Sequence, residues 1–164
     1  MMNYIYPALL TFLVLQCQKE PGNQPNQHTA AYAVSDGVQF GQEFTVERLE
    51  HVIVYGGETP RRLHVSARQL ADSRCPADVM CVQYGKATVV LSASNSQGEN
   101  DSIELCLGDC GEGANRSAHI VQATVGESIY SFTLREVQPF PGLEKEGEVQ
   151  KARLVVEKVK PAAK

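Results

Sequence analysis

Apolar and polar residues alternate along much of the chain. Because successive side chains of a β-strand point to opposite faces, a period of two predicts a strand with one buried face. Five segments follow this period: residues 63–68, 87–93, 103–107, 130–135 and 152–157. Less regular apolar runs at residues 40–46 and 50–55 predict two more strands, and an eighth is expected at residues 119–125.

Turn-forming residues separate these runs. The breaks lie at Gly56-Gly57, at Gly108-Asp109, at residues 95–98 (NSQG) and at residues 139–142 (PFPG). Residues 46–52 and 60–71 are the only ranges that compete as helix, and neither has a full apolar stripe. Seven to eight short strands in about 125 residues predict an all-β fold, an antiparallel β-sandwich or barrel.

The N-terminal pattern is different. Residues 5–15 (IYPALLTFLVL) are almost entirely apolar, and this run of eleven is about half of the roughly 20 residues that span a bilayer as a helix. An apolar run of this length is typical of a signal-peptide core and predicts export. Cys17 follows directly, where the apolar run gives way to a polar, Pro-rich stretch.

The residues around Cys17 resemble a bacterial lipoprotein signal, in which the cysteine becomes the acylated first residue of the mature chain. The following Gln18-Lys19-Glu20 is similar to the signal that sends lipoproteins of the Bacteroidetes to the cell surface. The resemblance implies lipidation of Cys17 and an anchored location at the outer membrane or cell surface. The alternatives are an ordinary cleaved signal peptide, with Cys17 as a bystander, and an uncleaved anchor.

These features divide the chain into four parts. We expect a signal peptide at 1–16, a lipidated N-terminus and flexible tether at 17–37, one β domain at 38–160 and a C-terminal tail at 161–164. The formal net charge is −4, and basic and acidic residues are interspersed. Because no basic block is present, we expect no nucleic-acid partner.

The four remaining cysteines form two close pairs. Five residues lie between Cys75 and Cys81, and three lie between Cys106 and Cys110. In an oxidising compartment this spacing favours disulfides, and the short distance in sequence favours pairing within each pair. A Cys106–Cys110 bond requires a chain reversal, which Gly108-Asp109 can supply. A zinc site with four thiolates is the alternative, but structural zinc usually shows a CxxC knuckle.

Residues 72–85 (DSRCPADVMCVQYG) are the most distinctive stretch. They resemble a motif of uncharacterised secreted and lipid-anchored bacterial proteins: DSRCP, two residues, Val, any residue, Cys, then an aromatic close to a Gly that precedes a strand. The likeness covers most of the domain and implies no activity.

The side chains of this motif suggest how it is held. Asp72 can accept backbone N–H bonds, Arg74 can pair with Asp72 or Asp78, and Pro76 fixes φ, while Gly85 ends the motif. These features favour a folding staple. A ligand-contacting loop is the alternative, because loops on β scaffolds commonly carry binding residues.

Catalytic motifs are not found in the sequence, and we expect no catalytic residue, metal or cofactor. The one metal alternative is calcium at Asp109, Glu112 and Asn115, which do not match an EF-hand. The sequence therefore predicts a non-enzymatic binding or structural module, held at the membrane by lipid, with an unknown protein or glycan partner. The alternatives are a small exported enzyme, hydrolytic or metal-dependent, and an inhibitor of an envelope or host enzyme.

Overall fold

The computed structural model describes residues 37–111 and 115–160, and within these ranges the chain forms nine strands and no helix. The strands are β1 (Val38–Gln39), β2 (Glu43–Glu47), β3 (His51–Tyr55), β4 (Arg62–Asp72), β5 (Lys86–Asn95), β6 (Gly98–Gly108), β7 (His119–Val125), β8 (Ser128–Gln138) and β9 (Lys151–Lys158). The parts predicted as signal peptide, tether and tail, and Cys17 itself, lie outside the described residues apart from Gly37. No helix in the described ranges has the length and apolarity needed to cross a membrane.

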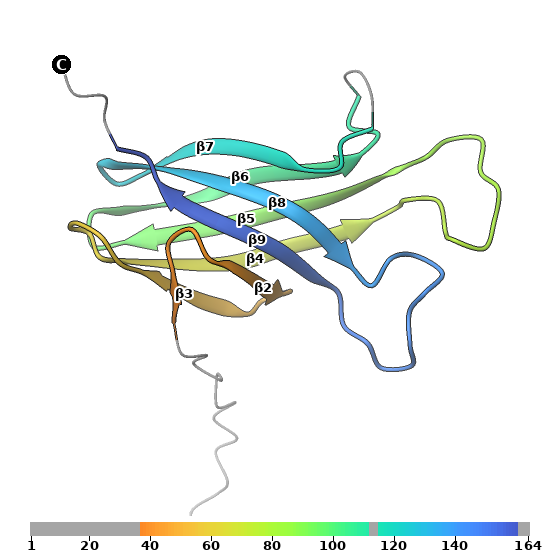
Figure 1. Cartoon of the computed structure of the whole chain (residues 1–164), viewed down its shortest axis with the longest axis horizontal. Helices are drawn as coiled ribbons and strands as arrows, with labels where there is room; N and C mark the ends of the chain where they lie inside the picture. The colour runs from red at the N-terminus through yellow and green to blue at the C-terminus, as the bar shows by residue number, and fades with distance from the viewer. Residues whose placement is uncertain (1–36, 112–114, 161–164) are drawn as a thin grey trace, which may run out of the picture. The chain divides into compact units, whose positions relative to one another are not determined.

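Two sheets pack face to face (Figure 1). One has the strand order β1-β3-β4-β5-β6 and the other β2-β9-β8-β7. All neighbours are antiparallel except β1 and β3, which pair in parallel. The predicted all-β fold with antiparallel sheets is confirmed.

Strand number and length differ from the prediction. The additional strand is β1, whose two residues are too few to show a period of two. Four strands contain ten or eleven residues and are not short. The two ranges that could compete as helix lie in β2–β3 and around β4, where the alternating apolar residues are buried against the other sheet.

The core lies between the sheets and follows the alternation read from the sequence. On β5, Ala87, Val89, Leu91 and Ala93 are fully buried, while the residues between them are only partly buried. The second sheet contributes its largest buried side chains from β8, and these belong to the same cluster. This burial of both inner faces against each other supplies the main driving force for folding.

The loops gather at the two ends of the sandwich. We call one the cysteine end: it carries the β4–β5 connection (73–85), the β6–β7 connection (109–118) and the β8–β9 connection (139–150). The opposite end, the turn end, carries the connections at 56–61, 96–97 and 126–127. Figure 1 shows the long loops of the cysteine end at the right. Val38 pairs with Val54 at the close of β3, so the described chain begins toward the turn end.

Candidate functional site

Two disulfides are present at the cysteine end, Cys75–Cys81 and Cys106–Cys110. Both join cysteines that are close in sequence, with Cα atoms 5.9 and 6.1 Å apart respectively. This is the local pairing that the spacing favours. The alternative of a zinc site with four thiolates is wrong, because the four sulfurs are bonded in pairs. Gly108, with φ of +86°, makes the reversal before Cys110.

Asp72 and Arg74 hold the beginning of the 73–85 loop. The backbone N–H of Arg74 donates to Asp72 Oδ1 at 3.0 Å, which is the Asx turn expected from the sequence. Arg74 Nε also donates to Asp72 Oδ1 at 2.9 Å, and Arg74 Nη2 lies 2.5 Å from Asp72 Oδ2. Of the two predicted partners, Arg74 therefore takes Asp72. The pair is buried, with side-chain exposures of 8% and 1% for Arg74 and Asp72.

Arg74 also connects its loop to the β8–β9 loop. Its Nη2 donates to the carbonyl of Val137 at 2.7 Å, and its guanidinium carbon lies 4.4 Å from the centre of the Phe140 ring. Beyond Arg74, the N–H of Ala77 donates to the carbonyl of Pro141 at 2.9 Å. Hydrogen bonds and a cation–π contact thus fix the two long loops to each other.

Gly85 closes the same loop. Its φ is +74°, and a Cβ at this position would collide with the carbonyl of Ser73. The carbonyl of Gly85 accepts the N–H of Asp109 at 2.8 Å, which ties the first disulfide loop to the second. Only glycine fits this conformation and this close approach, and this explains the last position of the motif.

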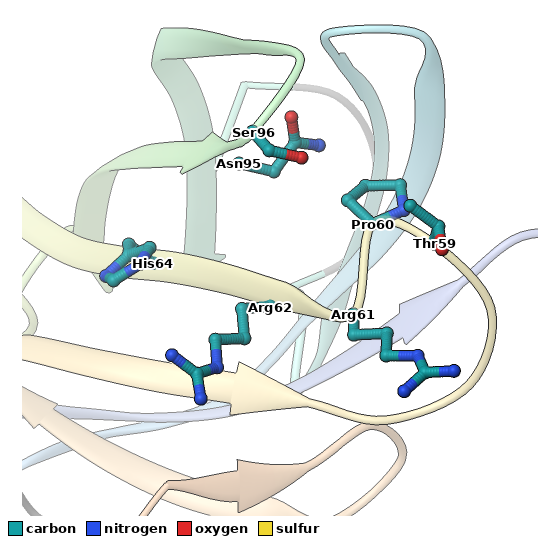
Figure 2. Close-up of a pocket in the computed structure, with 7 residues that line it drawn as sticks. All are labelled: Thr59, Pro60, Arg61, Arg62, His64, Asn95 and Ser96. Carbon is teal, nitrogen blue, oxygen red and sulfur yellow. The ribbon is translucent and has the colours of Figure 1, made fainter.

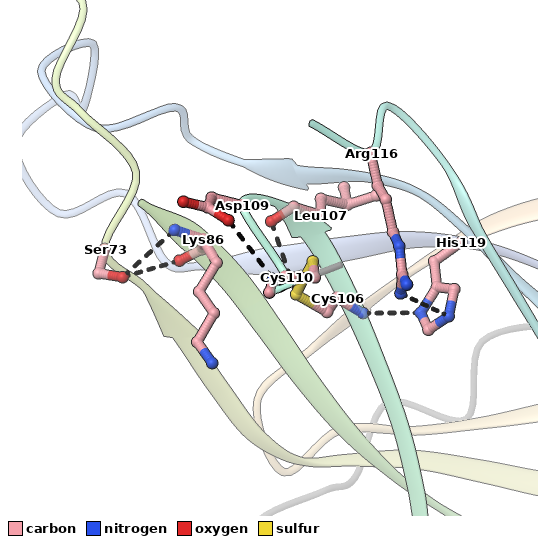
Figure 3. The surroundings of a disulfide bond; sticks show 9 residues. Ser73, Lys86, Cys106, Leu107, Asp109, Cys110, Arg116 and His119 are labelled. Atoms are coloured by element: carbon pink, nitrogen blue, oxygen red, sulfur yellow. Dashed lines mark hydrogen bonds between the residues drawn. A yellow bond between two sulfur atoms is a disulfide. The ribbon is translucent and has the colours of Figure 1, made fainter. Parts of the chain in front are cut away.

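The second disulfide has a polar neighbour, shown in Figure 3. The N–H of Cys106 donates to Nδ1 of His119 at 3.0 Å, and Arg116 Nη1 lies 3.2 Å from the other ring nitrogen, Nε2. Burial lowers the pKa of His119 below its ordinary value, and the charge of Arg116 lowers that pKa further. Nδ1 must carry no proton to accept the Cys106 hydrogen bond.

Apolar side chains project from the first disulfide loop. Met80 and Val82, on either side of Cys81, are completely exposed at 101% and 105%, and Val79 is 53% exposed. We call Val79, Met80 and Val82 the apolar tip. Leu143, on the β8–β9 loop, is 62% exposed as well. Adjacent apolar side chains on a rigid projecting loop are costly to hydrate and are typical of a contact surface.

The sequence alone does not single out Met80 as a contact residue. The available signal was the run Val79-Met80-Cys81-Val82, which places apolar residues where a loop between strands is normally polar. The sequence could not reveal that the disulfide and Arg74 leave these side chains outside the core.

Residues 37–111 and 115–160 hold no group of three or more potential metal ligands among His, Cys, Asp and Glu. Of the calcium alternative, Asp109 and Asn115 are exposed, and Glu112 lies outside the described residues. Comparison with protein-family models, curated proteins and solved structures found no match to the chain.

Proposed function

We propose that this protein is a non-enzymatic binding module of the bacterial envelope, anchored by lipid at Cys17, that holds a protein partner through the apolar tip. The observation that carries the proposal is the complete exposure of Met80 and Val82 on a loop closed by the Cys75–Cys81 disulfide. The lipid anchor and the envelope location rest on the sequence around Cys17.

The fixed shape of the loop favours binding. The disulfide, the Tyr84 carbonyl that accepts the N–H of Cys75, and the Pro141 carbonyl that accepts the N–H of Ala77 hold its backbone before a partner arrives. Little backbone entropy is then lost on association, so more of the burial energy appears as affinity. Burying a Val or Met side chain contributes roughly 1.5–3 kcal/mol.

The chemistry of the tip favours a protein over a glycan. Its three side chains are aliphatic or thioether groups, which donate no hydrogen bond to sugar hydroxyls and offer them only the weak acceptor of the Met80 sulfur. They project from the surface, so the complementary surface is a recess lined by apolar side chains. Methionine adapts to such a recess because its side chain is unbranched and polarizable.

The test compares two double variants of the full chain. Met80→Thr with Val82→Thr removes the two completely exposed side chains of the apolar tip. Ile120→Thr with Ile129→Thr removes two other exposed apolar side chains, on β7 and β8. Partners would be captured by cross-linking on intact cells and quantified. We expect the affinity of the tip variant for its partner, and with it the amount captured, to fall about tenfold or more, since each 1.4 kcal/mol of binding energy is a factor of ten. The control should capture as much as the natural chain.

Two results would contradict the proposal. In one, the tip variant captures the same proteins in the same amounts as the natural chain. In the other, the Ile120 and Ile129 control loses them to the same extent, so that general surface hydrophobicity is responsible.

The loop geometry also favours a second candidate, an inhibitor of an envelope or host enzyme. A projecting loop that is fixed at both ends can occupy an enzyme cleft without losing backbone freedom. Under this candidate the partner captured through Met80 and Val82 is an enzyme. Adding the natural protein would reduce its activity, and adding the tip variant would not.

A further inference from the structure

A groove of about 530 Å³ opens at the turn end, far along the strands from the apolar tip. One wall is the segment from Thr59 to Arg62, which leads into β4, and His64 follows on that strand. The other wall is the turn that carries Asn95 and Ser96 (Figure 2). The lining residues contain no carboxylate.

The charge in this groove is not neutralised by its described surroundings. Arg61, Arg62 and His64 are exposed, and none of the three side chains makes an ion pair or hydrogen bond with another described residue. Arg68 and Arg153, in contrast, pair with nearby carboxylates. Two adjacent unpaired guanidinium groups are notable in a chain with a net charge of −4.

The walls of the groove are firmly held, although the basic side chains are free. Asn95 Nδ2 donates to the Val125 carbonyl at 3.0 Å, and Asn95 Oδ1 accepts the N–H of Gln97 at 2.7 Å. On the other wall, Lys158 Nζ donates to the carbonyls of Glu58 and Thr59, at 3.2 and 2.9 Å. Pro60, which follows Thr59, is buried.

Fixed walls keep the groove open in the absence of a ligand. In Figure 2 both guanidinium groups point away from Asn95 and Ser96, and each is attached through a long side chain that makes no ion pair or hydrogen bond with a described residue. Rotamer changes of exposed side chains take picoseconds to nanoseconds, so both can turn toward a ligand.

We propose that this groove binds the phosphate group of an anionic ligand. Arg61 and Arg62 provide ion pairs, and His64 and the Ser96 hydroxyl provide further hydrogen bonds. A carboxylate is satisfied by one forked guanidinium, whereas a phosphate monoester carries up to two charges and three terminal oxygens. The donors in the groove therefore match phosphate better than carboxylate.

Phosphate could reach the groove from two sources, a lipid headgroup or a soluble phosphorylated molecule. The groove lies at the turn end, and β1, with which the described chain begins, lies toward the same end. The N-terminal segment that carries the proposed anchor continues from β1. Only the choice of a lipid source depends on the anchor proposed above; the phosphate site itself does not.

The test uses the full chain and two charge-matched variants. Arg61→Gln with Arg62→Gln removes both cations of the groove. Arg48→Gln with Arg135→Gln removes two exposed arginines elsewhere. One arm titrates glucose 6-phosphate, with glucose as its control, and follows the side-chain NMR signals of His64 and the arginines. The other arm measures co-sedimentation with vesicles that contain phosphatidic acid, whose headgroup is a phosphate monoester, and uses phosphatidylcholine vesicles as control.

We expect a phosphate probe to shift the His64 signal of the natural chain. The probe should bind the Arg61 and Arg62 variant about tenfold or more weakly, because losing one charge-assisted hydrogen bond lowers an affinity by about that factor. The Arg48 and Arg135 control should bind as the natural chain does. A loss confined to phosphatidic acid vesicles identifies a lipid source, and a loss confined to glucose 6-phosphate identifies a soluble one. In the vesicle arm every protein also carries Cys17→Ser, because an acylated N-terminus would bring all variants down with the vesicles to the same extent.

Two outcomes would overturn the proposal. Either the natural chain binds neither phosphate probe above its control, or both arginine variants lose binding equally, which would indicate attraction by net charge alone. The four substituted arginines are exposed, so each variant should melt at the temperature of the natural chain.

Discussion

At the scale of single residues, Arg74 is the side chain that joins the most separate parts of the cysteine end. It pairs with Asp72 on its own segment, donates to the carbonyl of Val137 and lies over the ring of Phe140. Both charges are removed from water, and each is offset by the other at hydrogen-bond distance. Such a pair adds little net stability when intact, but losing one member leaves an unpaired buried charge.

We therefore predict that Arg74→Met lowers the free energy of unfolding by roughly 3–5 kcal/mol, the range found when one partner of a buried ion pair is removed. The double variant Arg74→Met with Asp72→Ala should lose less than the sum of the two single changes, because it leaves no unpaired charge. Denaturant unfolding of the four proteins measures this coupling. Strictly additive losses would show that the two side chains do not act as a pair.

His119 makes the stability of the folded protein depend on pH. Its folded-state pKa is lowered below the ordinary 6.5 by burial, and further by the charge of Arg116. At and below pH 6.5 the unfolded chain therefore binds more protons at this residue than the folded chain does, so stability falls as the pH falls. The contribution of His119 is fully present above pH 6.5 and is lost as the pH drops toward the folded-state pKa.

The measurement is thermal unfolding between pH 8 and 5 for the natural chain and two variants. His119→Gln should remove this part of the pH dependence. Arg116→Gln should move the His119 titration, followed by NMR of the imidazole, closer to its ordinary value. A His119→Gln curve that falls in parallel with that of the natural chain would exclude the assigned role.

At the scale of elements, two β-bulges create the Arg74 site. On β4 the register shifts between Ala67 and Gln69, so burial resumes at Leu70 and not at Gln69. The shift turns Asp72 toward the interior, where its side chain is almost wholly buried. The bulge on β8, between Leu134 and Glu136, sets the register of the last residues of that strand, and these include Val137 with its carbonyl. Bulges re-aim side chains in this way in many sheets.

Removing each disulfide should show which of the two supports binding as well as stability. Replacing Cys75 and Cys81 with Ala should lower stability by about 2 kcal/mol, the chain-entropy value for a loop this short. For this domain size that corresponds to a melting shift of about 5–12 °C. Replacing Cys106 and Cys110 with Ala should cost a similar amount, because the second loop is about as short.

Partner capture distinguishes the two pairs. The Cys75 and Cys81 variant should lose the partner, because the apolar tip gains backbone freedom that binding must then remove. The Cys106 and Cys110 variant should keep it, and serves as a control of matched stability. Equal capture by both variants would mean that the first disulfide has no part in recognition.

At the scale of the whole molecule, the sandwich keeps two chemically different surfaces apart. The apolar tip lies at the cysteine end, and the basic groove lies at the turn end where β1 begins. Strands of ten or eleven residues separate them, each rising about 3.3 Å per residue. Two proposed ligands can therefore be bound without competing for the same surface.

Anchoring at Cys17 is the prediction that concerns the whole chain. Each buried CH₂ of an acyl chain contributes about 0.8 kcal/mol, so a doubly acylated N-terminus does not leave the membrane measurably. We expect Cys17→Ser to move the protein from the detergent-extracted fraction to the soluble one, and to abolish incorporation of labelled palmitate. An unchanged distribution of the variant would rule out the lipid anchor.

The all-β class, the alternation within the strands and the local pairing of the cysteines follow from the order of the residues along the chain. These are short-range properties: a period of two fixes which face is buried, and loops of three to five residues leave each cysteine one near partner. The Asx turn at Asp72 belongs to the same class, because donor and acceptor are two residues apart.

Contacts between residues far apart in the sequence depend on the folded arrangement of the two sheets. The choice of Asp72 over Asp78 as the partner of Arg74 depends on a bulge in β4. The hydrogen bond from Arg74 to the Val137 carbonyl joins residues that are 63 positions apart. The groove likewise brings together residues 59–64 and 95–96, which belong to different loops. Local patterns cannot specify such contacts, because strand register and sheet packing are settled by burying both inner faces at once.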